Sequence, residues 1–429
     1  MSARKTQSSA PPAERAAIVS FVLQSARTAD PDALLDELAG LVHAAGAVAV
    51  LRATQSRATR DAATLIGKGR AEQLGRACAE ADVTVVVFDN ELSPAQARNL
   101  EEKLGRRVVD RTQLILDIFA RRARTREGKL QVELAQLQYL LPRLVGSSAA
   151  LSRLGGGIGT RGPGETKLET DRRRLRDRLA KLRREIADVQ SRRGRLRERR
   201  ERRDLPTVAL VGYTNAGKST LFNLLTGGDA VASDAMFVTL DPLLRRARLP
   251  DARTILISDT VGFIDRLPHQ LVAAFHATLE EVASADLLLH VVDAAAPDAD
   301  RRDRAVRAVI EEVDAVEVPM LMVFNKVDLL APDDLARLKS RHPDAAFVSA
   351  RLGQGRDDLL EIVASRLAMD TERLHLQFSM ASDADRRQIA ELYRHARVLS
   401  HVTADDRVTM EVEAPKRLLD RLAHAKVPA

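Results

Sequence analysis

The sequence has little cysteine and few aromatic residues. It is 429 residues long with one cysteine, Cys78, no tryptophan and only 3% aromatic residues. A lone cysteine excludes an internal disulfide and any zinc site built from clustered cysteines. Too few aromatic side chains are present for nucleic-acid binding by a long series of stacked bases. The hydrophobic cores must therefore consist mainly of leucine, valine, isoleucine and alanine.

The chain also lacks a long apolar segment. No stretch reaches the roughly 20 apolar residues that a membrane-spanning helix needs. The first residues, Met1 to Ala16, are rich in serine, proline and alanine and lack the apolar segment of a signal peptide. We therefore interpret residues 1–29 as a disordered tail, and we expect a cytoplasmic protein without a transmembrane segment.

Positive charge is in excess. Lys and Arg number 67 against 60 Asp and Glu, which gives a net charge of +7, and 45% of residues are hydrophobic. A chain of this length and composition is expected to fold into roughly two to four domains. The charge favours a polyanionic partner, either nucleic acid or an anionic membrane surface. An arginine-rich proteome with solvated charges would produce the same balance, and composition does not distinguish the two explanations. Peripheral membrane association therefore stays possible.

The strongest motif lies at residues 207–220. An apolar segment ends at Gly212, and Gly217-Lys218-Ser219 follow at the G-x-x-x-x-G-K-S spacing of a phosphate-binding loop. The glycines allow successive backbone N–H groups to point at a phosphate. Lys218 would contact the β- and γ-phosphates, and Ser219 would bind Mg²⁺. With every fixed position filled between a strand and a helix, the motif predicts a nucleotide site.

Later segments add the ligands of a triphosphate. A predicted strand at 254–258 leads into Asp259-Thr260-Val261-Gly262. Asp259 would support the Mg²⁺ shell, and the Gly262 N–H would meet the γ-phosphate. Thr239 is the candidate for a second hydroxyl ligand of Mg²⁺ when triphosphate is bound.

The base is predicted from Asn325-Lys326-Val327-Asp328. A carboxylate at Asp328 can accept hydrogen bonds from the guanine N1–H and exocyclic amine, whereas adenine lacks this donor pair. Asn325 would join the base loop to the phosphate loop, and the backbone of Ser349 and Ala350 would meet guanine O6. Phe263 occupies the position where many GTPases carry a water-orienting glutamine. We therefore expect slow intrinsic hydrolysis that rises on a partner's surface.

The region before the motif predicts two structural units. Residues 30–127 alternate between strand and helix patterns, which predicts a small α/β domain with a parallel sheet. Its strands are expected at Ala47–Leu51, Val83–Phe88 and Val108–Asp110, with a helix from Ser93-Pro94 to Leu104. Gly67-Lys68-Gly69-Arg70 is compatible either with a phosphate contact or with a turn carrying solvated basic residues.

Residues 128–203 carry two heptad-patterned segments on either side of a glycine-rich loop at 154–164. This pattern predicts an antiparallel helical hairpin. The second segment is strongly basic and has few acidic residues to pair with, which favours contact with a polyanion over a solvated surface. The loop is suited to a narrow RNA crevice, and a flexible linker is the alternative. The seam consists of Leu130, Leu134, Leu137, Leu141, Leu144, Leu168, Leu175, Leu179, Leu182, Ile186, Val189 and Leu196.

The segments together predict an α/β protein. A P-loop GTPase domain with a doubly wound, mostly parallel sheet is expected at residues 204–370. A small C-terminal α/β or α+β domain follows at residues 371–429, with strands at Leu374–Phe378 and Val408–Val412 and a helix at Asp385–Arg397. No chemistry is evident in this last domain.

Over roughly residues 30–370, the chain resembles the HflX family of ribosome-associated GTPases. The most specific matches are GGGIGTRGPGETKLETDRRR at 155–174, FDNELSPAQARN at 88–99, GKLQVELAQLQYLLPRL at 128–144 and GYTNAGKS at 212–219. The resemblance implies a monomer that binds the ribosome when loaded with GTP, chiefly the 50S subunit and its ribosomal RNA. It implies the separation of stalled or idle ribosomes into subunits, and no DNA partner is expected.

The resemblance also implies the cofactors GTP or GDP and Mg²⁺. Ser219 and Thr239 would hold the metal, and Lys218, Thr239 and Gly262 would serve catalysis. One departure is Leu243-Leu244, where the family usually has two threonines. The implied nucleotide contacts are Gly212, Tyr213, Thr214, Asn215, Ala216, Gly217, Lys218, Ser219, Phe237, Val238, Thr239, Leu240, Asp241, Asp259, Thr260, Val261, Gly262, Asn325, Lys326, Val327, Asp328, Ser349, Ala350 and Arg351.

Two other functions remain as alternatives. The chain could be the GTPase subunit of an RNA- or tRNA-modifying complex, with the modifying site on a partner. It could also be an RNA-binding module in which the nucleotide only stabilises the fold. Stimulation of hydrolysis by ribosomes, stimulation by free tRNA, or no turnover under any condition would distinguish the three.

Overall fold

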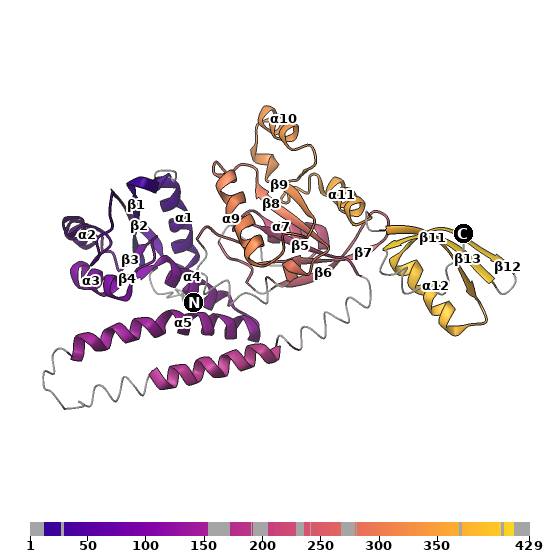
Figure 1. The fold of residues 1–429 in the computed structure, drawn as a ribbon. Helices are drawn as coiled ribbons and strands as arrows, with labels where there is room; N and C mark the ends of the chain where they lie inside the picture. Colours follow the sequence, from indigo (N-terminus) through magenta and orange to yellow (C-terminus); the bar gives the residue numbers. More distant parts are fainter. Residues whose placement is uncertain are drawn as a thin grey trace, which may run out of the picture. The chain divides into compact units, whose positions relative to one another are not determined.

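The computed structural model describes residues 13–26, 30–152, 172–189, 191, 205–228, 236–240, 242–266, 279, 281–368, 371–404 and 407–415. The chain divides near residue 184 into two compact units. Both are built from mixed α/β structure, as the sequence predicts (Figure 1).

The N-terminal domain is a four-stranded parallel sheet between two layers of helices. The strand order is β2-β1-β3-β4. Helices α1 and α4 cover one face, and α2 and α3 cover the other (Figure 1). The strands are β1 (Arg15–Leu23), β2 (Val48–Arg57), β3 (Val85–Phe88) and β4 (Arg107–Asp110), and the helices are α1 (Pro31–Ala44), α2 (Lys68–Glu80), α3 (Pro94–Leu104) and α4 (Arg111–Arg122), with a 3₁₀ turn at Gln24–Ala26.

The predicted disordered tail at residues 1–29 is wrong for residues 15–26. Strand β1 pairs in parallel with both β2 and β3, and Ala16, Ala17 and Ile18 are fully buried. A strand covered on both faces has a continuous apolar sequence without alternation, which here merges with the Ser/Pro/Ala-rich start of the chain. Residues 1–12 and 27–29 lie outside the described residues.

The N-terminus of α3 is capped where the Ser93-Pro94 pair predicts a helix start. The Ser93 hydroxyl accepts a hydrogen bond from the Gln96 N–H (3.2 Å), and the Gln96 side chain accepts one from the Ser93 N–H (3.0 Å). This reciprocal pair is a capping box, so the predicted start of α3 is confirmed. At the start of α2, the Gly67 N–H donates to the Gln55 side chain (2.9 Å).

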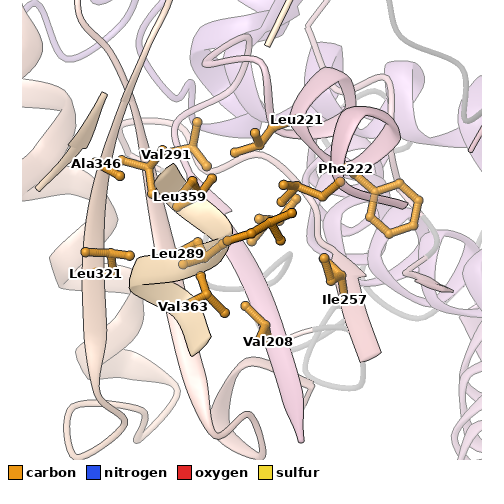
Figure 2. Close-up of a cluster of buried hydrophobic side chains, with 14 of the residues drawn as sticks. Val208, Leu221, Phe222, Ile257, Leu289, Val291, Leu321, Ala346, Leu359 and Val363 are labelled. Carbon is orange, nitrogen blue, oxygen red and sulfur yellow. The ribbon is translucent and has the colours of Figure 1, made fainter. Parts of the chain in front are cut away.

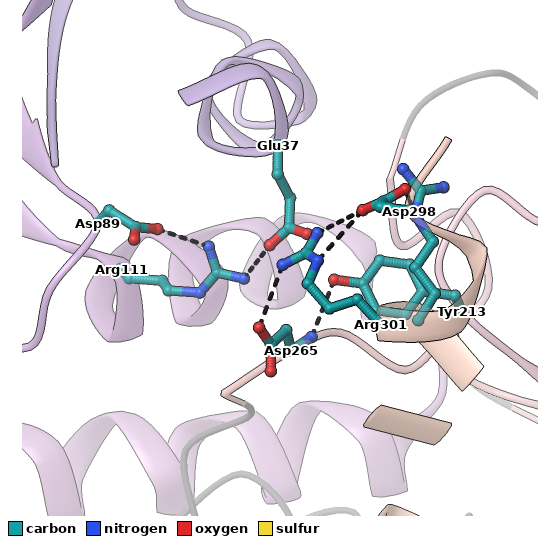
Figure 3. A network of polar contacts seen from close by, with 8 residues as sticks. Glu37, Asp89, Arg111, Tyr213, Asp265, Asp298 and Arg301 are labelled. Atoms are coloured by element: carbon teal, nitrogen blue, oxygen red, sulfur yellow. Dashed lines mark hydrogen bonds and ion pairs between the residues drawn. The ribbon is translucent and has the colours of Figure 1, made fainter. Parts of the chain in front are cut away.

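A buried ion cluster joins the helices on one face of this sheet to the end of β3 (Figure 3). Arg111, the first residue of α4, donates to Asp89 (2.9 Å) and also pairs with Glu37 of α1. All three side chains are almost fully buried. Removing one partner of such a cluster leaves an uncompensated buried charge, which is strongly destabilising. The cluster therefore favours the packing in which all three side chains meet.

A long helix, α5 (Arg126–Ser152), is anchored to the N-terminal sheet. The Tyr139 hydroxyl donates to Asp110 at the end of β4 (2.8 Å). Arg143 donates to the same carboxylate (2.8 Å) and to the Leu92 carbonyl (2.8 Å). Burial raises the pKa of Tyr139, so this phenol stays a hydrogen-bond donor.

The second arm of the predicted hairpin is a helix over residues 172–189, which runs antiparallel beside α5 (Figure 1). Arg178 makes two hydrogen bonds to Glu133 of α5 (2.6 and 2.7 Å). Leu179, Leu182 and Ile186 are buried, in agreement with the predicted seam. The glycine-rich loop at 154–164 lies outside the described residues.

The predicted GTPase domain contains a six-stranded sheet of order β10-β9-β8-β5-β7-β6. All pairs are parallel except that of β6, an edge strand antiparallel to β7. The strands are β5 (Thr207–Gly212), β6 (Leu243–Arg248), β7 (Thr254–Asp259), β8 (Leu287–Asp293), β9 (Met320–Asn325) and β10 (Ala346–Phe347), and the helices are α7 (Lys218–Thr226), α9 (Ala299–Glu312), α10 (Pro332–Arg341) and α11 (Arg356–Ala368), with a 3₁₀ turn at Val327–Leu329.

The core of this domain places β5 at the centre of the fold. Side chains of β5, β8 and β9 pack with Leu221 and Phe222 of α7 and with Leu359 and Val363 of α11 (Figure 2). Helix α9 contacts β5 and β8 and buries Val306. Strands β6 and β7, which follow β5 in the chain, lie on one side of β5. The chain then crosses to β8 on the other side, so the strand order reverses at β5. Ligands of open α/β sheets bind at the carboxyl ends of strands at such a point.

The C-terminal domain has an antiparallel sheet and is α+β. Strands β11 (Thr371–Ser379), β13 (Arg407–Pro415) and β12 (Arg397–Ala404) lie in this order and pack with α12 (Asp383–His395). The sequence did not indicate β12, because this edge strand is largely exposed and lacks an apolar pattern. Across the described part of the chain, no helix is long and apolar enough to cross a membrane.

We predict that Ile18→Ala lowers the stability of the N-terminal domain by about 2–5 kcal/mol, since it removes a fully buried side chain from a central strand. Native-state hydrogen exchange of peptides covering residues 15–23 measures this change. Val48→Ala, at a half-exposed position of edge strand β2, is the matched control and should cost less than about 1 kcal/mol. Exchange at 15–23 as fast as in an unfolded peptide would contradict the structure.

Candidate functional site

A cavity of about 440 Å³ lies at the carboxyl ends of β5 and β9. It is formed by five segments, each predicted from the sequence to contact one nucleotide: the phosphate loop, the segment around Thr239, the segment around Gly262, the base loop at 325–328 and the segment at 350–351 after β10. Its lining residues are Thr214, Asn215, Gly217, Lys218, Ser219, Thr220, Phe237, Val238, Thr239, Thr260, Gly262, Asn325, Lys326, Asp328, Leu329, Ala350 and Arg351.

The phosphate loop depends on its two glycines. Gly217 has a φ of +90°, and a Cβ atom there would lie 2.2 Å from Nδ2 of Asn325. A Cβ atom at Gly212 would lie 2.3 Å from the Val291 carbonyl oxygen. Since real Cβ atoms do not approach other atoms so closely, both positions require glycine. The loop then enters α7 at Lys218, where the first N–H groups of a helix favour an anion.

Lys218 is buried at the centre of the site. Its ammonium donates to the carbonyl oxygens of Gly212 (3.0 Å) and Tyr213 (2.8 Å). Burial lowers the pKa of Lys218 to about 8, and the negative charge of Asp259 partly opposes this shift. The lysine therefore lacks the full charge compensation that a bound phosphate would supply.

Three oxygen atoms meet beside Lys218. The Ser219 hydroxyl and the Thr239 hydroxyl each lie 2.8 Å from Oδ2 of Asp259 and 2.7 Å from each other. The other carboxylate oxygen of Asp259 is buried without a hydrogen-bond partner among the described residues. Burial raises the pKa of Asp259, whereas the Ser219 hydrogen bond and the charge of Lys218 lower it. A cluster of oxygen donors with one carboxylate fits Mg²⁺.

Asn325 joins the two ends of the cavity. Its amide group donates to the Ala216 carbonyl of the phosphate loop (2.9 Å), and its oxygen accepts from the Ala350 N–H (2.9 Å). The next residue, Lys326, has a φ of +64° and pairs with Asp293 at the end of β8 (2.8 Å). Asp328 follows in the 3₁₀ turn and lines the cavity.

The segment after β7 is attached to the phosphate loop. The Phe263 N–H donates to the Gly212 carbonyl (3.1 Å), and the Thr214 N–H donates to the Phe263 carbonyl (2.7 Å). The Phe263 side chain is buried and does not line the cavity. It therefore fills core space at the position where other GTPases carry glutamine.

Comparison with known proteins agrees with this geometry. Family models described as "GTP-binding GTPase N-terminal", "GTP-binding GTPase Middle Region" and "50S ribosome-binding GTPase" match residues 32–120, 122–200 and 207–326. The GTPase HflX of Caldanaerobacter subterraneus is 43% identical over 95% of this chain and 93% of its own length. The GTPase HflX of Escherichia coli K12 is 49% identical over 78% of this chain and 79% of its own. The chain belongs to the HflX family of GTPases.

Among solved structures, a GTP-binding protein of the archaeon Sulfolobus solfataricus in complex with GDP spans 83% of this chain and 99% of its own, with 23% identity and a TM-score of 0.44. The family and the geometry together define the activity. This HflX-family protein binds guanine nucleotide and hydrolyses GTP to GDP and phosphate.

Most of the predicted nucleotide contacts of this HflX-family GTPase line the cavity, and the others lie behind its wall or outside the described residues. Of the predicted set, Asp241 lies outside the described residues, and the others that do not line the cavity are Gly212, Tyr213, Ala216, Leu240, Asp259, Val261, Val327 and Ser349. Asp259 instead supports the two hydroxyls, and Ser349 accepts from the Leu352 N–H (3.2 Å). Thr220 and Leu329 line the cavity and were missed, although each directly follows a predicted contact, Ser219 and Asp328.

We predict that GDP binding takes up roughly half to one proton at pH 8.5, because a bound phosphate raises the lowered pKa of Lys218. The free protein loses the Lys218 proton as pH rises through about 8, so GDP affinity should fall above that pH. Titration calorimetry in buffers of different ionisation enthalpy measures the uptake. At pH 7 the lysine is already charged and its uptake should vanish; equal uptake at both pH values would contradict the assignment.

Proposed function

We propose that this protein is a GTP-switched factor that binds the large (50S) ribosomal subunit and separates stalled or idle 70S ribosomes into subunits. The observation that carries the proposal is a helical arm whose outward surface is basic and which is fixed to the rest of its unit. Similarity of residues 207–326 to the 50S ribosome-binding GTPase family supports the same partner.

The basic surface lies on the second arm of the hairpin. Arg173, Arg174, Arg176, Lys181, Arg183 and Arg184 are exposed, whereas Leu179 and Leu182 face the seam. Within residues 172–189 the acidic side chains are only Asp177, Glu185 and Asp188. This excess of positive charge on one side of a helix matches the phosphate backbone of RNA. The glycine-rich loop at 154–164 connects the two arms, and we propose that it contacts the peptidyl-transferase region of ribosomal RNA.

The nucleotide would act as the switch. Ser219 and Thr239 would hold Mg²⁺, which neutralises phosphate charge when bound. Lys218 would contact the β- and γ-phosphates, and the Gly262 N–H would meet the γ-phosphate. Since Phe263 cannot orient water, hydrolysis would be slow in the isolated protein and faster on the ribosome.

The direct test is sedimentation of ribosomes with the protein. We expect it to pellet with 50S subunits in the presence of a non-hydrolysable GTP analogue and to shift 70S particles toward subunits, with weaker binding in GDP. Ribosome-stimulated turnover is expected in parallel. Stimulation by free tRNA alone would instead favour a subunit of an RNA-modifying complex.

Charge reversal on the arm should weaken ribosome binding. We predict that Arg173→Glu, Arg176→Glu and Arg183→Glu together lower the affinity and reduce the slope of log K against log salt by about one for each phosphate that is no longer neutralised. GDP affinity should stay unchanged. The matched control carries the same charge change on α10, at the exposed residues Arg337, Lys339 and Arg341. An equal loss of affinity in both triple variants would show that only net charge matters.

Base recognition is assigned to Asp328. We predict that Asp328→Asn weakens GTP binding by roughly 10- to 150-fold, because charged hydrogen bonds to guanine are lost. The new amide can donate to O2 of xanthine, so xanthosine triphosphate should bind the variant better than the parent protein. Competition binding with the two nucleotides measures the change in preference, and unchanged GTP affinity would refute the assignment.

A further inference from the structure

Tyr213 and Thr214 occupy variable positions of the phosphate loop, and each bonds to a segment that carries another nucleotide ligand. The Thr214 hydroxyl accepts a hydrogen bond from the Phe237 N–H (3.2 Å), two residues before Thr239. The Tyr213 hydroxyl accepts one from the Asp265 N–H (3.0 Å), in the segment after β7. The loop therefore contacts both segments through side chains whose identity the phosphate motif leaves open.

The Tyr213 contact is part of a closed ring of side chains (Figure 3). The Asp265 carboxylate accepts from Arg301 (3.1 Å), which also donates to Asp298 at the start of α9 (2.6 Å). Asp298 forms an ion pair with Arg302 (2.6 Å), and the Arg302 guanidinium lies 5.2 Å from the centre of the Tyr213 ring. The ring joins the phosphate loop, the segment after β7 and the first turn of α9.

Gly262 packs against the phosphate loop, three residues before Asp265. A Cβ atom on Gly262 would be 2.8 Å from Cα of Thr214 and 3.1 Å from the ammonium nitrogen of Lys218. The backbone of Gly262 is therefore held directly beside the lysine of the phosphate loop. Any movement of the chain between Gly262 and Asp265 would change the position of the N–H group that meets a γ-phosphate.

We propose that Tyr213 is a positioning residue for GTP hydrolysis. Its hydroxyl, together with the ring of ion pairs, holds residues 262–265 against the phosphate loop, so that the Gly262 N–H is in place for the γ-phosphate. Tyr213 acts through Asp265, because its buried side chain does not line the nucleotide cavity. GDP has no γ-phosphate, so the effect of Tyr213 is confined to the triphosphate.

The test uses Tyr213→Phe in the full chain, which keeps the aromatic ring beside Arg302 and removes only the hydroxyl. We expect the single-turnover rate at saturating GTP to fall about three- to tenfold, with a similar loss of affinity for a non-hydrolysable GTP analogue. Affinity for GDP should change less than about twofold. Tyr393→Phe in the C-terminal domain, which removes a hydroxyl bonded to His401, is the matched control and should leave turnover unchanged.

A double-mutant cycle separates positioning from a general loss of structure. Asp265→Asn retains the N–H that Tyr213 accepts and weakens the pairing with Arg301. If the ring acts as one unit, the double variant loses no more activity than the more damaging single variant. Additive losses would overturn the proposal, as would an unchanged Tyr213→Phe protein. Equal losses of GDP and GTP-analogue affinity with an unchanged saturated rate would assign Tyr213 a structural role only.

Discussion

The nucleotide site depends first on the side-chain amide of Asn325. One end of this amide holds the Ala216 carbonyl and the other holds the Ala350 N–H, so a single planar group sets the distance between the phosphate loop and the base loop. The Asn325 amide lies so close to residue 217 that no side chain fits there, which is why this position is glycine. Since β5, β9 and β10 end at one edge of the sheet, three segments far apart in sequence reach this amide without any long connection.

The charges of the site suit a polyanionic nucleotide. Lys218 is buried with a lowered pKa, and Asp259 is buried with a raised pKa, so each is poorly compensated without phosphate or cation. A bound phosphate would compensate the buried charge of Lys218. The side chain at position 263 contributes nothing to this chemistry, because it packs in the core. The backbone of Phe263 bonds to Gly212 and Thr214 of the phosphate loop. The contact between Tyr213 and Asp265 adds a second attachment two residues further along the chain, which is the role we propose for Tyr213.

The basic arm is fixed by a chain of polar contacts inside the N-terminal unit. Asp110 at the end of β4 binds both Tyr139 and Arg143 of α5, and Glu133 of α5 binds Arg178 of the second arm. Helix α5 therefore bonds to the N-terminal sheet through Tyr139 and Arg143 and to the second arm through Glu133. A helix that is held in place before binding loses less conformational freedom when a partner binds, which raises the affinity.

The local chemistry of this protein follows from its amino-acid sequence. The phosphate loop, the Asp-x-x-Gly segment, the guanine motif and the start of α3 at Ser93-Pro94 were all predicted, because each depends on residues adjacent in sequence. Other features depend on contacts between residues far apart in the chain. Strand β1 could not be distinguished from a tail because its pairing partners, β2 and β3, come later in the sequence, and β12 could not be found because it is an exposed edge strand without an apolar pattern. The motif places Tyr213 in the phosphate loop, and only the fold shows that its side chain lies beside Asp265 and Arg302. A sequence motif shows which residues can bind a ligand. The tertiary packing decides which other residues hold them in position.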